Sequence, residues 1–323
     1  MTCPSSSILA AVMLSAAAAG GAASADPLVE IRNAAVRVVV VPEARADIDI
    51  KVLKSNPKLP LFIGTMGEAT VLDGHLSTWF LSCHGRGRDL RARIMDRGEF
   101  SYDDLPQVII RTPMNVRVET GGLGAGGVVS GAIGRAHSVS LRQGACGDWT
   151  VANVEDRLEA KVGGSGDIST GTAASADLVI SGSGRLRAQA VRGDLRARVS
   201  GSGHVDVASA GSADLVISGS GDVHTGPVAD GLRASISGSG DLSVERLAGA
   251  FDANVSGVGD IKVAEGRVTT MRTRISGSGD VSFGGEADSL QAVISGRGDV
   301  RVSSVKGDVD KHVSGSGEVH IGP

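Results

Sequence analysis

The stretch Ile275-Ser-Gly-Ser-Gly-Asp-Val281 stands again, letter for letter, at residues 217–223. Seven close variants bring the number of copies to nine: VGGSGDI at 162, ISGSGRL at 180, VSGSGHV at 199, ISGSGDL at 236, VSGVGDI at 255, ISGRGDV at 294 and VSGSGEV at 313. The apolar residues that open successive copies are 18 to 20 residues apart. A nearly fixed period of this length is typical of a solenoid, in which each repeat forms one coil and stacks on its neighbours.

The residues around each copy alternate in polarity, as they do in β-strands whose side chains point to opposite faces. Before the motif, Leu158 and Ala160 of one repeat are followed by Ala176 and Leu178 of the next. This exchange of volume between two columns is expected where both face one filled core. A second inward strand follows the glycines, and a less regular third side carries Val191, Val228, Leu247 and Val305. We therefore predict an all-β protein, a single-stranded parallel β-helix of roughly ten to eleven coils with about 19 residues each.

The two glycines of the motif are present in all nine copies, whereas its acidic position holds Arg185 in one copy and His204 in another. Glycine is needed where the backbone takes a positive φ or where chains stack closely. The pair therefore predicts a corner between two strands of a coil, and a phosphate loop is excluded because no helix follows. The corner glycines are Gly164, Gly166, Gly182, Gly184, Gly201, Gly203, Gly219, Gly221, Gly238, Gly240, Gly257, Gly259, Gly277, Gly279, Gly296, Gly298, Gly315 and Gly317.

A column of carboxylates follows the corner in the last six coils: Asp222, Asp241, Asp260, Asp280, Asp299 and Glu318. Coils about 4.8 Å apart would bring these like charges together, at a cost of roughly 0.9 kcal/mol per pair in bulk water. Hydrogen bonds to corner N–H groups, splayed side chains or bound Ca²⁺ would offset the repulsion. Two interpretations stay open, a bare column and a weak calcium site; no other cofactor is indicated.

A second charged column lies three residues before the opening apolar residue of each copy. From Asp177 to Arg272 its sign alternates from coil to coil. A slip by one coil would set like charges together, so we interpret the column as a control of register.

Residues 1–25 have the features of a secretory signal, with an apolar run and an Ala-Ser-Ala cleavage site before Asp26. The expected mature chain contains no segment long and apolar enough to span a membrane as a helix. A net charge of −4 argues against a nucleic-acid partner. We therefore expect an exported protein of the periplasm, the cell surface or the medium.

Residues 26–107 precede the repeats and are expected to form an N-terminal β segment, either as entry coils or as a cap. Residues 36–52 and 108–118 alternate like strands, and the polar loop 82–106 reads as a long hairpin or as a short helix around Arg88–Asp96. Residues 121–134 are interpreted as one more degenerate coil of the repeat domain, which we place at 108–323. A solenoid needs its open end covered, so capping is the expected role of the N-terminal segment.

Two cysteines remain after the predicted cleavage, Cys83 and Cys146. An exported chain can oxidise them to a disulfide, and two free buried thiols are the alternative. Their spacing does not match a zinc site. If the chain has a ligand site, we expect it near the N-terminal part, around Arg86, Arg88, Arg91 and Arg93 and the aromatic residues Trp79, Phe80, Phe100, Tyr102 and Trp149. Packing of the cap explains the same residues equally well.

The repeated (I/V)SGSGD(V/L/I) motif resembles the head GIN domain family, which carries the description "putative auto-transporter adhesin". The resemblance covers roughly residues 108–323 and implies an exported β-helical structure with an adhesin-like role. The uniform repeats favour a non-enzymatic surface or envelope interaction module. The alternatives are a protein that binds or cleaves polysaccharide, and an envelope scaffold that self-associates through its last coil, where Val319 and Ile321 have no evident polar cap. The partner is an envelope glycan, another protein or a second copy.

Overall fold

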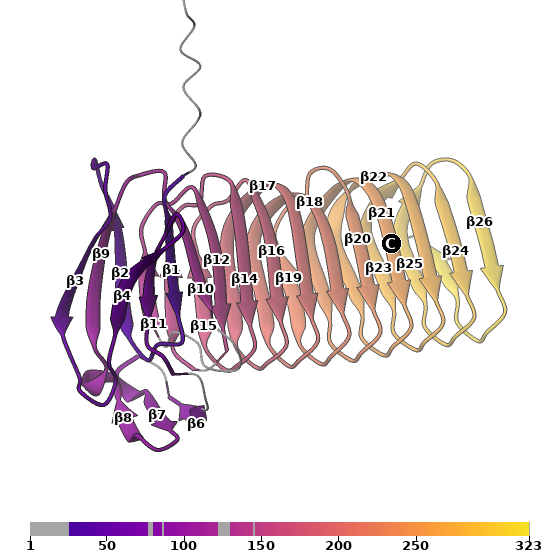
Figure 1. The fold of residues 1–323 in the computed structure, drawn as a ribbon. Coiled ribbons are helices and arrows are strands. Elements are labelled where there is room, and N and C mark those ends of the chain that lie inside the picture. Colours follow the sequence, from indigo (N-terminus) through magenta and orange to yellow (C-terminus); the bar gives the residue numbers. More distant parts are fainter. Residues whose placement is uncertain (1–25, 77–79, 86, 122–129, 145, 323) are drawn as a thin grey trace, which may run out of the picture.

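Each coil of the protein consists of a first strand, a glycine corner, a second strand and a short third side (Figure 1). The computed structural model describes residues 26–76, 80–85, 87–121, 130–144 and 146–322. The predicted signal, residues 1–25, lies outside the described residues. The coils stack into a parallel β-solenoid of about 10 turns with about 19 residues per turn, as the sequence predicts.

The first side, which precedes the corners, is a ladder of parallel strands. In spatial order these are β5 (Ala69–Asp73), β1 (Leu28–Arg32), β10 (Arg117–Gly121), β12 (Ser138–Gln143), β14 (Arg157–Val162), β16 (Ser175–Ile180), the C-terminal parts of β17 (Arg185–Val199) and β18 (His204–Ile217), β20 (Leu232–Ile236), the C-terminal parts of β21 (Leu242–Val255) and β22 (Ile261–Ile275), β24 (Leu290–Ile294) and β26 (Val309–Val313).

The second side follows the corners and is also parallel. Its strands are β9 (Gln107–Thr112), β2 (Arg37–Pro42), β11 (Ser130–Ile133), β13 (Asp148–Val151), β15 (Asp167–Thr170), the N-terminal parts of β17 and β18, β19 (Asp222–Thr225), the N-terminal parts of β21 and β22, β23 (Val281–Ala287), β25 (Val300–Val305) and β27 (Val319–Ile321). Single bridges such as Ala173 to Val191 and Val228 to Leu247 mark the third side.

The register of the ladders places the opening residues of successive motifs opposite one another, as Ile217 with Ile236 and Val255 with Ile275. The predicted inward columns are buried: Leu158, Ala160 and Leu178 each have no exposed surface. The predicted charge column is stacked in register as well. Its members Asp252 and Arg272 form an ion pair at 3.8 Å, whereas Asp177 is bridged by Arg157 and Arg198 from neighbouring positions.

Close stacking explains the corner glycines. A Cβ added to any of them from Gly166 onward would lie 1.9 to 2.4 Å from a carbonyl oxygen of the preceding coil, for example 1.9 Å from the Gly219 oxygen at Gly238. Of the two reasons for glycine given above, a positive φ does not apply, since none of the corner glycines of the nine copies is among the described residues with positive φ. The close approach of one coil to the next is therefore the constraint.

The residue between the two corner glycines contributes its backbone N–H. The N–H of Val258 donates to the Gly238 oxygen at 3.0 Å, and that of Arg297 donates to the Gly277 oxygen at 2.9 Å. The same bond forms at Ser239 and Ser278 in other copies. Because the backbone makes this contact, the side chain at the position is free to vary.

The N-terminal strands enter the solenoid out of sequence order. Strand β1 lies between β5 and β10, and β2 lies between β9 and β11. The stack ends with two antiparallel strands, β3 (Asp49–Lys54) beside β9 and β4 (Phe62–Met66) beside β5. The segment therefore supplies both entry coils and a cap. Strand pairing shows no break at the expected boundary between residues 107 and 108, because β9 crosses it and pairs with β2 of the N-terminal segment. Residues 108–118 belong to β9 and β10, which lie on different sides of the solenoid.

The polar loop forms a small antiparallel sheet of β6 (Phe80–His84), β7 (Arg91–Ile94) and β8 (Gly98–Ser101). The alternative of a helix around Arg88–Asp96 is wrong, since this stretch contains β7. The only helical elements among the described residues are two 3-10 turns, Gly87–Asp89 and Tyr102–Asp104. No helix in the described part of the chain has the length and apolar character needed to cross a membrane. We call β6 to β8 with these turns the hairpin unit.

The last coil carries a lysine in its inward column. Lys311 stands opposite Ala292 in the inward column of the first side, and its ammonium donates to the Val319 carbonyl at 3.3 Å. Around it, Val309, Val313 and Ile321 are 41%, 44% and 39% exposed. The expectation that this end has no polar cap stays a prediction, although a charged side chain occupies the column that holds alanine or leucine in most coils. An inward-pointing charge on an edge strand opposes the addition of a further strand.

Candidate functional site

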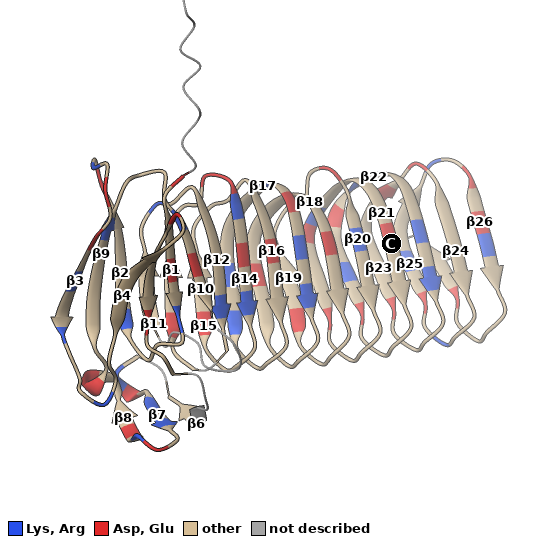
Figure 2. Ribbon diagram, viewed as in Figure 1, with Lys and Arg blue, Asp and Glu red and all other residues tan. Residues whose placement is uncertain are grey.

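Charged residues of both signs alternate along the strands of the first side (Figure 2). Against this regular background, two neighbouring coils depart from the repeat. Arg185 and His204 replace the corner carboxylate, and both point into the same row as Asp167 and Asp222. The departure places basic and imidazole groups together in one region of the second side.

A groove of about 500 Å³ lies beside these two coils. Its floor includes small or apolar residues, Ala188, Val207, Ala208 and Gly226, and its walls carry Arg187, Asp206, His224 and Glu245. Because small side chains stand where larger ones would fill the corner between the second and third sides, the surface is hollowed there. We call this feature the second-side groove.

One ion pair, between Arg187 and Asp206, lies in the walls of the second-side groove, and further charged groups lie beside it in the corner row. Arg187 Nε lies 3.5 Å from Asp206 Oδ2, and His204 lies between Asp206 and Asp222 at 4.0 and 3.4 Å. At the start of the row the Asp167 carboxylate accepts the N–H of Arg185 at 3.0 Å. The groove thus presents cations and carboxylates held at neighbouring positions, which suits a ligand bearing both hydrogen-bond donors and acceptors.

His224, Ser243 and Glu245 have the chemical composition of a nucleophile, a base and an orienting acid. His224 Nδ1 is 2.8 Å from Ser243 Oγ, but Nε2 is 3.8 Å from Glu245 Oε1, beyond hydrogen-bond reach. The side chains of His224 and Glu245 are 44% and 63% exposed. A catalytic triad needs a base held by its acid and a site shielded from water. The three residues do not form such a relay in this structure.

The six-carboxylate column has a different role. Each carboxylate from Asp222 to Asp299 accepts the backbone N–H of the next acidic residue, at distances of 2.7 to 3.0 Å. Arg301 lies across Asp280 and Asp299 at 2.7 and 2.6 Å, and the hydrogen bond to Asp280 is the main cause that raises its pKa. Among the described residues no group of three or more His, Cys, Asp or Glu side chains is placed to hold a metal ion.

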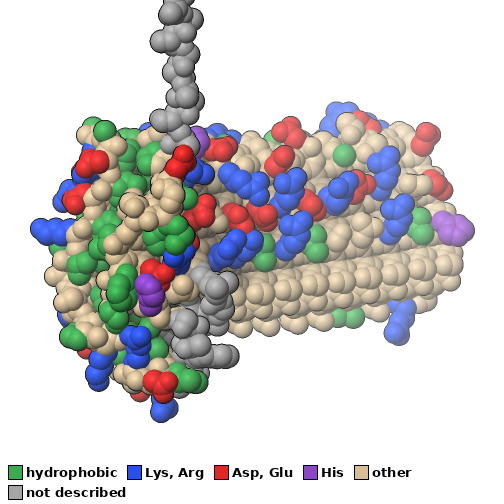
Figure 3. Space-filling model, in the orientation of Figure 1, with side chains coloured by type: hydrophobic (Ala, Val, Ile, Leu, Met, Phe, Trp, Pro, Cys, Tyr) green, Lys and Arg blue, Asp and Glu red, His purple; other side chains and the backbone are tan. Residues whose placement is uncertain are grey.

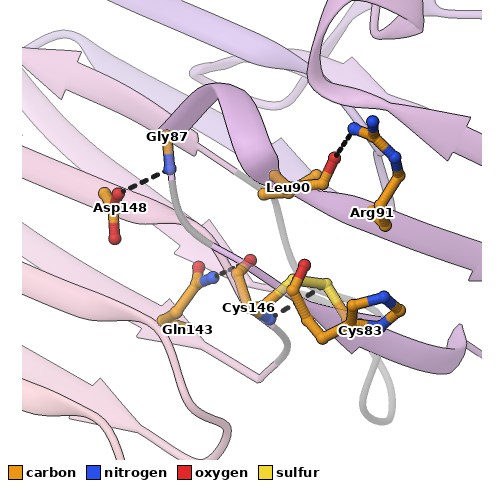
Figure 4. The surroundings of a disulfide bond; sticks show 8 residues. Cys83, Gly87, Leu90, Arg91, Gln143, Cys146 and Asp148 are labelled. Atoms are coloured by element: carbon orange, nitrogen blue, oxygen red, sulfur yellow. Dashed lines mark hydrogen bonds between the residues drawn. A yellow bond between two sulfur atoms is a disulfide. The ribbon is translucent and has the colours of Figure 1, made fainter.

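A disulfide joins Cys83 of the hairpin unit to Cys146, in the corner between β12 and β13 (Figure 4). The two Cα atoms are 5.4 Å apart across a sequence separation of 63 residues. Nearby, the N–H of Gly87 donates to the Asp148 carboxylate at 3.1 Å. These contacts fasten the hairpin unit to the corner of an early coil. The disulfide is thus a structural tie.

The described arginines and aromatic residues of the expected ligand site do not come together at one place. Arg88, Arg91 and Arg93 are exposed, whereas Phe100 packs inward in the core of the hairpin unit. Trp149 is buried and donates to Gln143 at 3.0 Å, and Tyr102 lies under the guanidinium of Arg37. Trp79, Arg86 and the side chain of Phe80 lie outside the described residues. The described rings of Phe100, Tyr102 and Trp149 thus make packing contacts within the protein.

The second-side groove was not anticipated from the sequence, although one signal pointed to it. Arg185 and His204 are the two departures from an otherwise acidic position, and each stands two residues before a lining residue of the groove, Arg187 and Asp206. The departure shows where the repeat is broken, but the hollow beside it depends on how small side chains stack over three coils.

Comparison with known proteins places the chain in a family without assigning an activity. Two solved structures are similar to it over 92% of each chain: a "putative lipid binding protein" from Parabacteroides distasonis ATCC 8503, at 14% identity and TM-score 0.31, and a "putative adhesin" from Bacteroides fragilis NCTC 9343, at 12% identity and TM-score 0.26. No curated protein matches the chain significantly. The model of one family matches residues 109–226 and 228–322, most of the solenoid. The chain belongs to the family described as "putative auto-transporter adhesin, head GIN domain".

Proposed function

We propose that the protein is an exported, non-enzymatic interaction module of the cell envelope or cell surface, and that it binds its ligand through the second-side groove. The observation that carries this proposal is the clustering of Arg187, Asp206 and His224 around a hollow, next to the two coils that break the repeat. Membership in a family described as adhesins supports the same class of function.

The groove is built for binding. Its cations and carboxylates are paired with one another, as in Arg187 with Asp206, so a polar ligand would exchange these contacts for its own. The walls reach over several coils and the strands beneath them are rigidly paired, which holds the groups in place before a ligand arrives. We assign the ligand to the envelope glycans that carry carboxylate or amino groups.

The first test concerns location. Protease added to intact cells is expected to degrade the protein if it is displayed on the surface, and cell lysis should then expose no further protected pool. Protection in intact cells followed by degradation after opening of the outer layer would restrict the protein to the periplasm and would rule out adhesion to other cells.

The second test concerns the groove. The purified exported chain, carrying a fluorescent label, is mixed with isolated cell-wall sacculi and with intact cells. The double substitution Arg187→Ala and His224→Ala is expected to weaken binding by about tenfold or more, since two charge-assisted contacts are lost. Lys262→Ala is the matched control, in the same outward column and two coils beyond His224. Equal binding by both variants would reject the groove, and release of soluble sugar from sacculi would show an enzyme instead.

A further inference from the structure

The two ends of the solenoid differ in their chemistry. At the N-terminal end, β4 pairs with β5 by one edge, and no other described strand pairs with its second edge. Phe62, Ile63 and Met66 on β4 are 52%, 48% and 57% exposed, and residues 59–67 contain no charge. Hydrophobic side chains gather over this end of the rod in Figure 3. A flat, uncharged edge strand of this kind is a template for pairing with another strand.

We propose that β4 is an interface between two copies of this chain, paired antiparallel about a two-fold axis through Gly64. Pairing centred there overlaps all five residues of the strand. Phe62 of one copy stands opposite Met66 of the other, and Ile63 stands opposite Thr65. Every direct pair is apolar or uncharged, so the strand is complementary to itself in the way that a two-fold interface requires.

The contacts of β4 within one chain support this assignment. The ring of Phe62 packs edge-on against His75 with 4.3 Å between centroids, and the Arg32 guanidinium donates to Met66 Sδ at 3.9 Å. Phe62 and Met66 lie on the same face of the strand, four residues apart, with Gly64 between them. They are therefore held ready for a partner strand, and the small glycine lets the two backbones meet closely at the axis.

The opposite end is unsuited to the same contact. Strand β26 carries Asp310 and His312 outward, and Lys311 points into the core column. A strand added there would trap the Lys311 ammonium away from water, and a symmetric pairing centred on it would set two ammonium groups together. Head-to-tail stacking of copies meets the same lysine. We therefore place the self-association at the N-terminal end, whereas the sequence-based expectation placed it at the last coil.

A pair of five-residue strands buries little surface, so the dimer is expected to be weak and to depend on concentration. Its consequence is bivalence. Two rods joined at their N-terminal ends would point their C-terminal coils in opposite directions and carry one second-side groove each. Two weak sites on one assembly bind a repetitive surface more tightly than either alone.

Cysteine crosslinking tests the register. A Cβ at Gly64 meets no atom within 4 Å, so Gly64→Cys fits the folded chain. Residues opposite each other in antiparallel strands have Cα atoms about 4.5 to 5.5 Å apart, within the range of a disulfide. Mild oxidation of the Gly64→Cys chain is expected to give a covalent dimer. Met66→Cys alone should not, because residue 66 faces Phe62 of the other copy, whereas a mixture of Phe62→Cys and Met66→Cys should give mixed dimers.

Sedimentation tests the interface without a crosslink. The mass of the exported chain is expected to rise with concentration over about 1 to 100 µM, and Ile63→Lys should weaken the association by about tenfold or more. Val258→Lys, at a corner residue that is 60% exposed, is the matched control and should leave the association unchanged. A monomer throughout, or crosslinking of Met66→Cys as fast as that of Gly64→Cys, would overturn the proposal. If monomeric Ile63→Lys binds sacculi as well as the parent chain does, the groove remains the proposed binding site, and only the requirement for two copies is rejected.

Discussion

Asp222 Oδ1 accepts the backbone N–H of Asp241, one coil later, at 3.0 Å. The same bond links each acidic residue of the column to the next, ending at Glu318. Arg185 makes the same bond to the Asp167 carboxylate at 3.0 Å, whereas the N–H of His204, whose preceding coil has Arg185 in place of a carboxylate, donates to the Gly184 oxygen at 3.1 Å. A side-chain carboxylate therefore takes the place of a backbone acceptor. The bond to a charged acceptor offsets the repulsion between neighbouring carboxylates.

Removal of one carboxylate from this ladder should expose one amide. Asp260→Ala leaves the N–H of Asp280, now bonded at 2.7 Å, without its acceptor. We expect hydrogen exchange at Asp280 to accelerate by about fivefold to tenfold, since a hydrogen bond of this kind contributes on the order of 1 kcal/mol. Asp260→Asn retains an acceptor oxygen and should show little change. Acceleration that is equal in both variants would mean that charge, and not acceptance, matters.

Corner glycines should be the least replaceable residues of the chain. Gly238→Ala would bring a methyl group to 1.9 Å from the Gly219 oxygen, so the coils must separate. We expect a loss of about 2 to 4 kcal/mol in the free energy of unfolding. Gly163→Ser is the control, because its nearest contact is 3.8 Å away and serine stands there in the other copies. Urea denaturation followed by circular dichroism measures both; equal midpoints would contradict the stacking explanation.

Reduction of the disulfide should loosen the hairpin unit and spare the solenoid. The link between Cys83 and Cys146 spans 63 residues, for which loop closure in the unfolded chain corresponds to about 4 kcal/mol. Limited proteolysis after reduction is expected to cut within residues 84–101 while a fragment containing the later coils survives. Cys83→Ser should reproduce the effect without reductant. General degradation of the later coils would show that the tie supports the whole rod.

Acid should weaken the N-terminal end through Asp73. Burial alone would raise the pKa of Asp73, but hydrogen bonds from the His75 N–H at 2.7 Å and from Arg32 Nε at 2.8 Å outweigh it and hold the pKa below its ordinary value. A lowered pKa contributes stability above the unfolded value of about 3.9, which is lost as pH falls through the folded value. Thermal melting of the parent chain and of Asp73→Asn should therefore differ at pH 7, begin to converge near pH 4 and meet only once the pH has fallen through the lowered folded value. A constant gap would reject the assignment.

Replacement of Lys311 by an apolar residue should make the last coil prone to self-association. Lys311→Val removes the only charge from the inward column of β26 and leaves the apolar residues Val309 and Val313 beside it. We expect new oligomers or aggregation, measured by light scattering. Lys306→Ala, which loses an ion pair with Glu286 outside that column, should remain unchanged. Identical light scattering from both variants would mean that Lys311 does not prevent association at the last coil.

The solenoid was predictable because its constraint is repeated. In the nine copies the two glycines persist, whereas the acidic position also holds Arg185 or His204. The exchange of volume between the columns that contain Leu158 and Ala160 identified the strand face that points inward. The reason for the glycines was only half predicted: the sequence permits a positive φ or close stacking, and coordinates alone distinguish a Cβ that lies 1.9 Å from a neighbouring carbonyl.

Features that occur once were harder to predict. The sequence around Arg91 and Arg93 left a long hairpin and a short helix open, and pairing of β7 with both β6 and β8 places the two arginines on the outer face of a strand. The second-side groove depends on Ala188, Ala208 and Gly226 being adjacent across coils, and no local pattern marks that adjacency. The interleaving of β1 and β2 with later strands is likewise a long-range event without a sequence signature.

The interleaved N-terminal strands imply an order of events during synthesis. Residues 28–42 are made early, yet their neighbours are residues 69–73, 107–121 and 130–133. The first partner of β1 therefore follows about 40 residues later and that of β2 about 70 residues later, and the second neighbour of each strand follows only after about 90 residues. The later coils, which contact only their sequence neighbours, can form one after another without this delay. A chaperone that shields residues 28–42 in that interval would guard the step at which the nascent chain is most exposed to aggregation.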